Sequence, residues 1–419
     1  MSNAEGTRTV TQSDGDGPAG AGPAVSEATP RTVAAPDVPA PASPPDSEAT
    51  PRTVAAPDVP APASPPDSGT APPPSFVPPL PLPRTPAPAE PDPGRAPGPR
   101  LAVPAPVPAR SKGMTRLLWL DPGQVRFATR RFRLGPARER LEDAERSFTT
   151  GFNAMVAGEP GRIDDLREDL RGFGYEGAGT ACATLDVLTL TGGRRLRELL
   201  GGQGLLHPHL IHLGTGRAYA RMRLRPMWGI RSVHPLLRWL AHDGFGFHQG
   251  FFCSDRTVGH QRTAGLMDRT RRAVFDQGLG RMLWFHECAR ADDIAPRIAE
   301  FPAGRRADLW SGVGLAATYV GGASPADLER LASAASGDGF RAHLAQGAAF
   351  ACAFRLISGV VPDHTVAAAP VLCGTEVDEA ADWTDSALVA LGHNAYSGED
   401  YQAWRAGIRK AWARRDRDA

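Results

Sequence analysis

Ionisable side chains lie among aromatic ones in two segments of this sequence, residues 244–253 and 275–288. Histidine and carboxylate side chains transfer protons, and an aromatic wall suits a pocket for a long unsaturated or polycyclic molecule. The candidates for proton transfer are His248, His286 and Glu287, and those for the aromatic wall are Phe247 and Trp284. The same composition also fits a phenylalanine-rich core whose polar side chains face solvent.

Three segments share a pattern that begins with Gly-x-Gly and ends in cysteine nine or ten residues after the first glycine: residues 172–182, 244–253 and 278–288. When the first two are aligned on their first glycine, Glu176 takes the place of His248, which makes Glu176 a further candidate for proton transfer. Glycine costs a helix roughly 0.5–1 kcal/mol relative to alanine. Its repeated use therefore predicts that neighbouring backbones approach closely or that helices begin sharply.

Arg217 in the sequence GTGR and Arg281 in GLGR are the candidates for binding an anion, either a carboxylate or a phosphopantetheine phosphate. The alternative is that both are ordinary surface arginines. Cys253 and Cys288 could act as nucleophiles if each lay beside a histidine, and otherwise they fill space in the core. The five cysteines include no CxxC pair and no signal segment is present, which predicts a reducing, cytoplasmic location.

Two short motifs suggest bound cofactors but lack the context that such sites need. Gly172, Gly174 and Gly177 fit the dinucleotide pattern GxGxxG, yet the sequence before them is charged and helical rather than a strand. The histidines of HPHLIH, residues 207–212, would need three converging ligands, and Pro208 disturbs a regular helical face. We therefore predict no metal site and no dinucleotide, and the sequence identifies no other cofactor.

Helical signals dominate residues 114–419, and helices must position these side chains. Apolar residues recur at helical spacing in residues 163–173, and Ser324 followed by proline is a strong helix start. The evidence for strands is limited to short alternating patterns at residues 185–191 and 365–372. We predict a mainly α fold that forms one large domain.

One part of this domain resembles another. GAGTACA at residues 177–183 recurs as GAAFACA at residues 347–353, and a Gly-Phe step and an acidic helix precede each copy. We predict two duplicated helical units, at about residues 148–235 and 308–395, that bury their apolar faces on each other. Ligand sites tend to form where such units meet.

Residues 1–113 form a Pro/Ala-rich tail of different composition. They hold 30 of the 41 prolines, and one 21-residue unit occurs twice without a mismatch, at residues 26–46 and 47–67. This composition offers too little apolar surface to offset the entropy lost when a chain becomes ordered, so we predict that the tail is disordered. The composition changes at Met114, so translation could start either at Met1 or at Met114. The remaining chain has 39 basic and 35 acidic residues, which predicts no nucleic-acid partner, and no apolar run is long enough to span a membrane.

The chain resembles the UnbL-type family of proteins, which are encoded beside enediyne polyketide synthases in actinomycetes and have no established activity. The stretches that carry the resemblance are FRLGPARERLEDAERSFTTGFNAMVAG, GFGYEGAGTAC, HLGTGRAYARM, DGFGFHQGFF, FDQGLGRMLWFHEC and RRADLWSGVGLAATYVGG, which together span about residues 132–322. The resemblance implies a role in making or maturing an enediyne core, alongside the polyketide synthase and companion proteins. It implies no catalytic residues.

Together the residues and the resemblance predict an accessory protein of enediyne biosynthesis that binds or acts on a conjugated polyene, free or bound to a carrier. As an enzyme it would use the histidine and glutamate candidates for proton transfer and one of the two arginines as an anion contact. The alternatives are a non-catalytic scaffold or chaperone for the pathway enzymes, and a resistance protein that sequesters a reactive product. Convergence of Glu176, His248 and Glu287 on one cavity would favour the enzyme.

Overall fold

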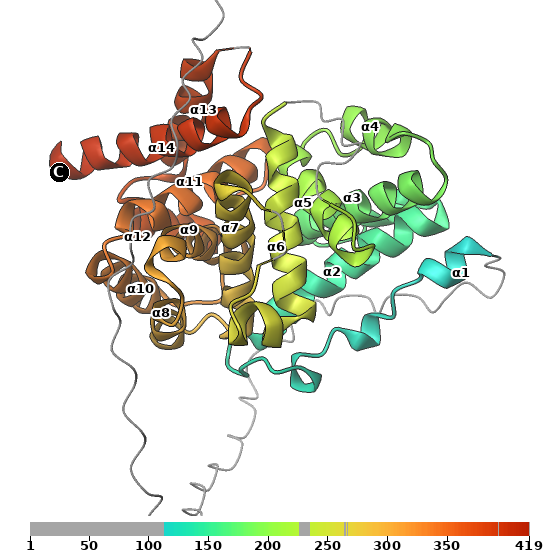
Figure 1. The fold of residues 1–419 in the computed structure, drawn as a ribbon, viewed down its shortest axis with the longest axis horizontal. Coiled ribbons are helices and arrows are strands. Elements are labelled where there is room, and N and C mark those ends of the chain that lie inside the picture. The colour runs from blue at the N-terminus through green and yellow to red at the C-terminus, as the bar shows by residue number, and fades with distance from the viewer. Residues whose placement is uncertain (1–112, 226–234, 264, 266, 393, 419) are drawn as a thin grey trace, which may run out of the picture. The chain divides into compact units, whose positions relative to one another are not determined.

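The computed structural model describes residues 113–225, 235–263, 265, 267–392 and 394–418 (Figure 1). Within these ranges the chain is mostly helical and contains no strand, which confirms the predicted mainly α fold. The α-helices are α1 (Met114–Leu118), α2 (Arg138–Ala157), α3 (Arg171–Leu188), α4 (Arg194–Gly201), α5 (Pro208–Arg221), α6 (Leu240–Phe252), α7 (Arg269–His286), α8 (Ala291–Ala299), α9 (Ala303–Val320), α10 (Pro325–Gly337), α11 (Arg341–Ile357), α12 (Asp363–Cys373), α13 (Val377–Leu391) and α14 (Gly398–Asp418). The tail prediction falls almost entirely on residues 1–112, which lie outside the described residues. None of the described helices combines the length and the apolar composition needed to cross a bilayer.

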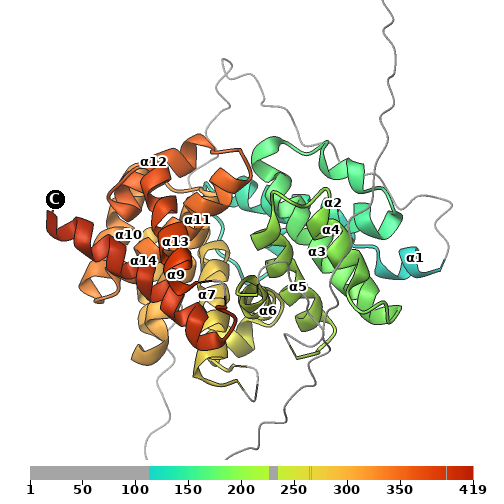
Figure 2. The same ribbon diagram turned by 90° about the horizontal axis from the view of Figure 1, so that it is seen from above.

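Seven helices form a continuous array in which each packs against the next: α2, α3, α5, α6, α7, α9 and α11 (Figures 1 and 2). Neighbours run antiparallel, because Gly151 of α2 faces Gly174 of α3 while the earlier residue Phe148 faces the later Gly177. α2 also contacts α9, so the helix array curves back toward its own start. α4 packs on α3, while α10, α12, α13 and α14 pack around α11.

Each inner helix of the array carries a Gly-x-Gly step whose first glycine faces the preceding helix and whose second faces the following one. The steps are Gly177 and Gly179 in α3, Gly214 and Gly216 in α5, Gly244 and Gly246 in α6, Gly278 and Gly280 in α7, and Gly312 and Gly314 in α9. A Cβ atom at any of these positions would overlap a backbone oxygen of the facing helix. The predicted close approach of backbones is therefore confirmed, and only glycine permits it.

The alignment on Gly172 that paired Glu176 with His248 is wrong. The step of α3 that faces both of its neighbours begins at Gly177. Glu176 therefore corresponds to Asp243, and each of these acids comes directly before the glycine that faces the preceding helix. The sequence could not decide between the two registers, because α3 contains two glycine pairs five residues apart.

Local structure differs from the sequence patterns in three places. Residues 163–173 do not form one helix, because 3₁₀ turns at Pro160–Ile163 and Glu168–Leu170 precede α3. Residues 185–188 end α3 and residues 189–191 follow it in a turn, while residues 365–372 lie within α12, so neither stretch forms a strand. Alternation over so few residues is a weak signal, and packing of the apolar side chains on neighbouring helices overrides it.

The first segment predicted as a duplicate, about residues 148–235, supplies part of α2 and all of α3 and α5 to the array, and the second, about residues 308–395, supplies most of α9 and all of α11. Residues 226–234 of the first segment lie outside the described residues. Gly177 and Gly347 occupy matching places, since each faces a backbone oxygen of the preceding array helix. Every neighbouring pair in the array packs in this way, so the likeness does not single out two halves, and the duplication stays a prediction.

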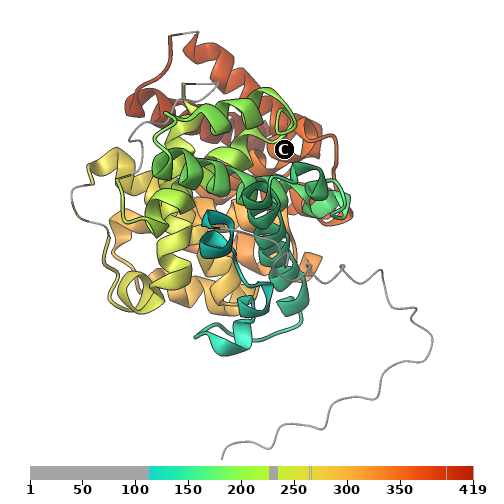
Figure 3. The same ribbon diagram turned by 90° about the vertical axis from the view of Figure 1, so that its right-hand side faces the viewer.

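Residues 113–137, which we call the N-terminal segment, run along the array before α2 begins (Figure 3). The backbone N–H of Leu120 donates to Asn153 of α2 at 2.9 Å, and the Asn153 amide donates back to the Leu120 carbonyl at 2.8 Å. The backbone N–H of Arg133 donates to the carbonyl oxygen of His286 at 2.8 Å. These bonds hold the segment against α2 and α7, where it forms one wall of a cavity.

Candidate functional site

A cavity of about 900 Å³, which we call the pocket, lies between the N-terminal segment and helices α2, α5 and α6. Its aromatic wall consists of Phe148, Phe245, Phe251 and Phe252. The ionisable residues that line it are Asp121, Arg130, Glu145, Arg217, Arg221, Arg223, His248, Cys253 and Arg256. A volume of this size lies within the usual range of ligand sites, and the mixture of rings and charges suits an amphiphilic molecule.

A buried ion pair between Glu145 of α2 and Arg217 of α5 forms part of the pocket lining. Two guanidinium nitrogens of Arg217 contact the two carboxylate oxygens at 2.8 and 3.0 Å, and both side chains are almost fully buried. The guanidinium carbon of Arg217 lies 3.6 Å from the centre of the Phe148 ring. Glu145 and Phe148 are three residues apart, so one face of α2 presents both. Arg217 therefore lies at the pocket as an anion-binding residue would, but a carboxylate of the protein already occupies it.

Further charged groups lie behind this pair. Arg281 donates to Asp243 at 2.7 Å, and Asp243 also accepts a hydrogen bond from Gln277 at 2.7 Å. Glu176 lies 3.5 Å from Arg217 and 3.9 Å from Arg281. We name the five ionisable residues the buried charge cluster: Glu145, Glu176, Arg217, Asp243 and Arg281. The cluster crosses the interior of the array from α2 to α7.

The buried charge cluster holds three carboxyl groups but only two guanidinium groups, so one carboxyl is in excess. Burial raises the pKa of Glu176 and of Asp243, against the opposing effect of the nearby arginines. Asp243 accepts two hydrogen bonds of 2.7 Å, whereas the arginine contacts of Glu176 are 3.5 Å or longer. Glu176 therefore has the weaker compensation for its burial, and we expect it to be the carboxyl that holds a proton, which would leave the cluster electrically balanced.

His248 lines the pocket from α6, and its ring lies 4.5 Å from that of Phe252. Burial lowers the pKa of His248 to about 3, and the charges of Arg217 and Arg221 act in the same direction. The imidazole is therefore neutral at pH 7. A neutral imidazole at a pocket can accept a proton or a hydrogen bond from a bound molecule.

Glu287 and His286 lie at the C-terminal end of α7 and do not line the pocket. Glu287 is fully buried and contacts Arg133 at 2.7 Å, Arg297 at 2.8 Å and His286 at 2.9 Å. Burial disfavours ionisation of Glu287, but the hydrogen bonds from His286 and Arg297 outweigh it and lower the pKa to about 2. This carboxylate ties the N-terminal segment to α7 and α8, and the structure does not bring it together with His248.

Trp284 and Phe247, the remaining predicted site residues, do not line the pocket. Trp284 is fully buried and donates from its indole nitrogen to the carbonyl oxygen of Gly321 at 2.9 Å. The guanidinium carbons of Arg217 and Arg281 lie 4.8 and 4.9 Å from the ring centre of Phe247, which therefore packs against the buried charge cluster and does not line the pocket. Of the eight predicted site residues, the pocket is lined by His248 and Arg217, its buried side holds Glu176, Arg281 and Phe247, and Glu287, His286 and Trp284 lie elsewhere.

The cysteine and histidine motifs form no nucleophilic or metal-binding arrangement in the described part of the chain. Cys253 lines the pocket and is exposed, while Cys288 is buried. The ring of His207 stacks on Tyr175 at 4.4 Å, and that of His209 stacks on Phe354 at 4.1 Å. Among the residues that the structure describes, no group of three metal-binding side chains converges.

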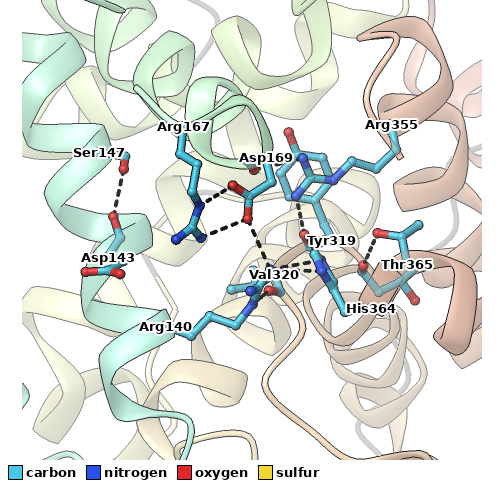
Figure 4. Close-up of polar contacts among 11 residues, drawn as sticks. Arg140, Asp143, Ser147, Arg167, Asp169, Tyr319, Val320, Arg355, His364 and Thr365 are labelled. Carbon is cyan, nitrogen blue, oxygen red and sulfur yellow. Dashed lines mark hydrogen bonds and ion pairs between the residues drawn. The ribbon is translucent and has the colours of Figure 1, made fainter. Parts of the chain in front are cut away.

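A second polar cluster joins α2 to α9 and α12 where the array curves back (Figure 4). Arg140 contacts Asp169 at 3.6 Å and His364 at 2.9 Å. Arg355 donates to the carbonyl oxygens of Asp169 at 2.9 Å and Tyr319 at 2.6 Å. Burial, followed by the charge of Arg140, lowers the pKa of His364 to about 4. His364 is therefore neutral near pH 7, and small changes of pH around neutrality do not alter its charge. The contacts of this cluster hold the two ends of the array together.

Sequence reasoning missed several residues of this region, which are Glu145, Asp243, Arg130, Arg221, Arg223 and Arg256. Asp243 carried a usable signal, because it precedes Gly244 as Glu176 precedes Gly177. The arginines carried none, since the chain contains 45 arginines and the sequence does not show which of them share a cavity.

The curved array with a cavity at its side places the chain among all-helical proteins that contain a ligand-sized pocket. A family model described as "Protein of unknown function (DUF1702)" matches residues 112–412, and the chain belongs to this family. No curated protein and no solved structure matches the chain.

Proposed function

We propose that the pocket binds an elongated, mainly apolar molecule that carries negative charge at one end. The observation that carries this proposal is a cavity of about 900 Å³ that four phenylalanines and five arginines line together with only two acidic residues. Aromatic rings favour a flat conjugated chain, and guanidinium groups favour carboxylate or phosphate. Arg217 neutralises Glu145, which leaves an excess of positive charge for the ligand.

We further propose that the ligand is a conjugated polyene and that the protein is an accessory factor of enediyne polyketide biosynthesis. The pathway rests on the resemblance of residues 132–322 to the UnbL-type family, and the aromatic wall of the pocket agrees with a polyene ligand. Deletion of the gene in the producing strain, followed by metabolite profiling, tests the pathway. Unchanged enediyne output in the deletion strain would contradict the assignment of the protein to this pathway.

A binding experiment tests the ligand class. cis-Parinaric acid, a conjugated tetraene with a carboxylate, fluoresces when it enters an apolar site. Phe252 is 52% exposed, so Phe252→Ala removes part of the pocket wall without opening the core, and it should weaken binding by about five- to tenfold. Leu205→Ala is the matched control, because Leu205 is 59% exposed and does not line the pocket. Absence of saturable binding, or equal losses in both variants, would contradict the proposal.

Within this proposal, His248 is the residue that transfers a proton. Glu176 lies behind Arg217, and Glu287 lies outside the pocket, so neither reaches a molecule bound there. If the His248 imidazole accepts a proton from one carbon of the polyene and returns it to another, the polyene is isomerised, and its ultraviolet absorption spectrum would shift over time in the wild type and not in His248→Ala. A spectrum that stays constant in both proteins would assign the pocket to binding alone.

The scaffold alternative predicts the opposite pattern. A scaffold would form stable complexes with pathway proteins in pull-downs from the producing strain and would have no affinity for cis-parinaric acid. The same titration therefore separates the two functions.

A further inference from the structure

Four arginines at the pocket have no acidic partner among the described residues, and these are Arg130, Arg221, Arg223 and Arg256. We call them the four unpaired arginines. The fifth arginine of the lining, Arg217, is paired with Glu145. The second acid of the lining, Asp121, accepts a hydrogen bond from the backbone N–H of Gly123 at 2.8 Å and so caps the turn that follows it. The lining therefore leaves several positive charges without compensation.

The residues next to two of these arginines are paired with each other. Arg131 contacts Asp255 at 2.6 Å, and both side chains are well exposed. This bridge joins the chain at Arg130 to the chain at Arg256. Asp255 is therefore paired with Arg131, and neither Arg130 nor Arg256 forms an ion pair with it.

Arg130 is held in place by aromatic rings and not by an acid. Its guanidinium carbon lies 4.5 Å from the ring centre of Phe251 and 4.9 Å from that of Phe252. Its Nε atom is buried and has no hydrogen-bond partner. The carboxylate of Glu145 acts on Arg130 but is already paired with Arg217, so the partial burial of the Arg130 guanidinium is only partly compensated, and a bound anion would offset the remaining cost.

Arg223 occupies a backbone position where glycine is expected. It follows the end of α5 with a φ of 58°, in the left-handed region that glycine adopts most easily. The backbone N–H of Leu224 donates to the carbonyl oxygen of Tyr219 at 2.9 Å, which fixes this helix end. A side chain retained at a strained position next to a pocket points to a use for that side chain.

We propose that the four unpaired arginines form a phosphate-binding site at the rim, and that the pocket takes an apolar chain joined to a phosphate-bearing head group. This inference rests on the proposed function, because the apolar chain occupies the pocket. One arginine can satisfy a carboxylate, whereas a phosphate monoester carries up to two charges on three terminal oxygens and can engage several arginines. A phosphate diester, as in phosphopantetheine attached to a carrier protein, keeps one charge on two such oxygens. Phosphopantetheine thioesters, either free or attached to a carrier protein, and phosphate esters of long-chain alcohols share this chemistry.

Competition experiments test the head group. The methyl ester of cis-parinaric acid, which has no charge, first reports occupancy of the pocket. S-palmitoyl phosphopantetheine, a carrier protein loaded with the same thioester, and hexadecyl phosphate are then compared with palmitic acid as competitors. At least one phosphate-bearing ligand should bind about tenfold more tightly than palmitic acid, and salt at about 0.5 M should reduce the difference. The tightest of the three identifies the source of the phosphate.

Two variants test the arginines without threatening the fold. Arg223→Gly removes the side chain from a position that glycine favours, and Arg221→Gln keeps an exposed polar residue at the end of α5. Each should weaken the preferred phosphate ligand by about tenfold and leave the methyl ester unchanged. Arg414→Gln is the matched control, because Arg414 is exposed on α14 and does not line the pocket.

The outcomes separate this inference from the proposed function. If the methyl ester binds but phosphate ligands bind no better than palmitic acid, the phosphate site is wrong and the apolar pocket stands. If Arg223→Gly and Arg221→Gln leave phosphate binding unchanged, or Arg414→Gln weakens it equally, the site is also wrong. If the methyl ester does not bind, the proposed function itself fails.

Discussion

The two glutamates that contact Arg217 should respond differently to the same substitution. Glu145 forms the ion pair with Arg217, with contacts of 2.8 and 3.0 Å, whereas Glu176 lies 3.5 Å away and burial raises its pKa, so we expect it to be protonated. Glutamine has the shape of a protonated glutamic acid and carries no charge. Glu145→Gln therefore removes a buried charge, and Glu176→Gln replaces one neutral group by another.

The expected sizes follow from the burial of Arg217, whose side chain is 3% exposed. A buried charge left without its partner costs about 3–5 kcal/mol. In Glu145→Gln, Glu176 could ionise and become the new partner of Arg217, which would recover part of this cost, so we expect the free energy of unfolding to fall by about 2–3 kcal/mol. In Glu176→Gln we expect it to fall by less than about 1 kcal/mol. The double variant blocks that compensation. It should lose more than the sum of the two single variants, up to about 5 kcal/mol.

Urea unfolding of the four proteins at pH 7 measures these differences in the free energy of unfolding. The pKa of Glu176 is raised in the folded chain, so its contribution to stability is present below the unfolded value of about 4.3 and is lost as pH rises through the folded value. Glu176→Gln should remove this loss. Equal costs of the two single variants, or a double variant that is merely additive, would show that Glu176 is ionised and would refute the reasoning.

Three further results are expected. Gly246→Ala should destabilise the fold by about 1–3 kcal/mol, because its Cβ would overlap the backbone of α7, whereas Gly304→Ala, at an open position in α9, should stabilise it by up to about 1 kcal/mol in thermal melts. Glu287 has a pKa lowered to about 2, so its contribution of about 3 kcal/mol is present above pH ~4.3 and disappears toward pH ~2, and Glu287→Gln should flatten this acid-side loss in urea titrations. Cys253, exposed at the pocket, should react with iodoacetamide before the four buried cysteines, and bound cis-parinaric acid should slow that reaction, as peptide mass spectrometry would report.

The local features of this protein could be predicted from its amino-acid sequence. Helical periodicity and the absence of sustained alternation predicted the mainly α fold. Ser324 caps α10 as its sequence indicates, because a capping side chain bonds to a backbone only three residues away. The Gly-x-Gly steps predicted close helix packing, because only a missing side chain permits it.

The pairing of charged side chains could not be predicted from the sequence, because it depends on how the helices pack. Arg217 and Glu145 are separated by 72 residues, and Arg281 and Asp243 by 38, and the array brings each pair together. The same array sends Glu287 to Arg133 and away from His248. The strength of an ion pair depends on distance in space and on burial, and in a chain with 45 arginines the sequence shows neither.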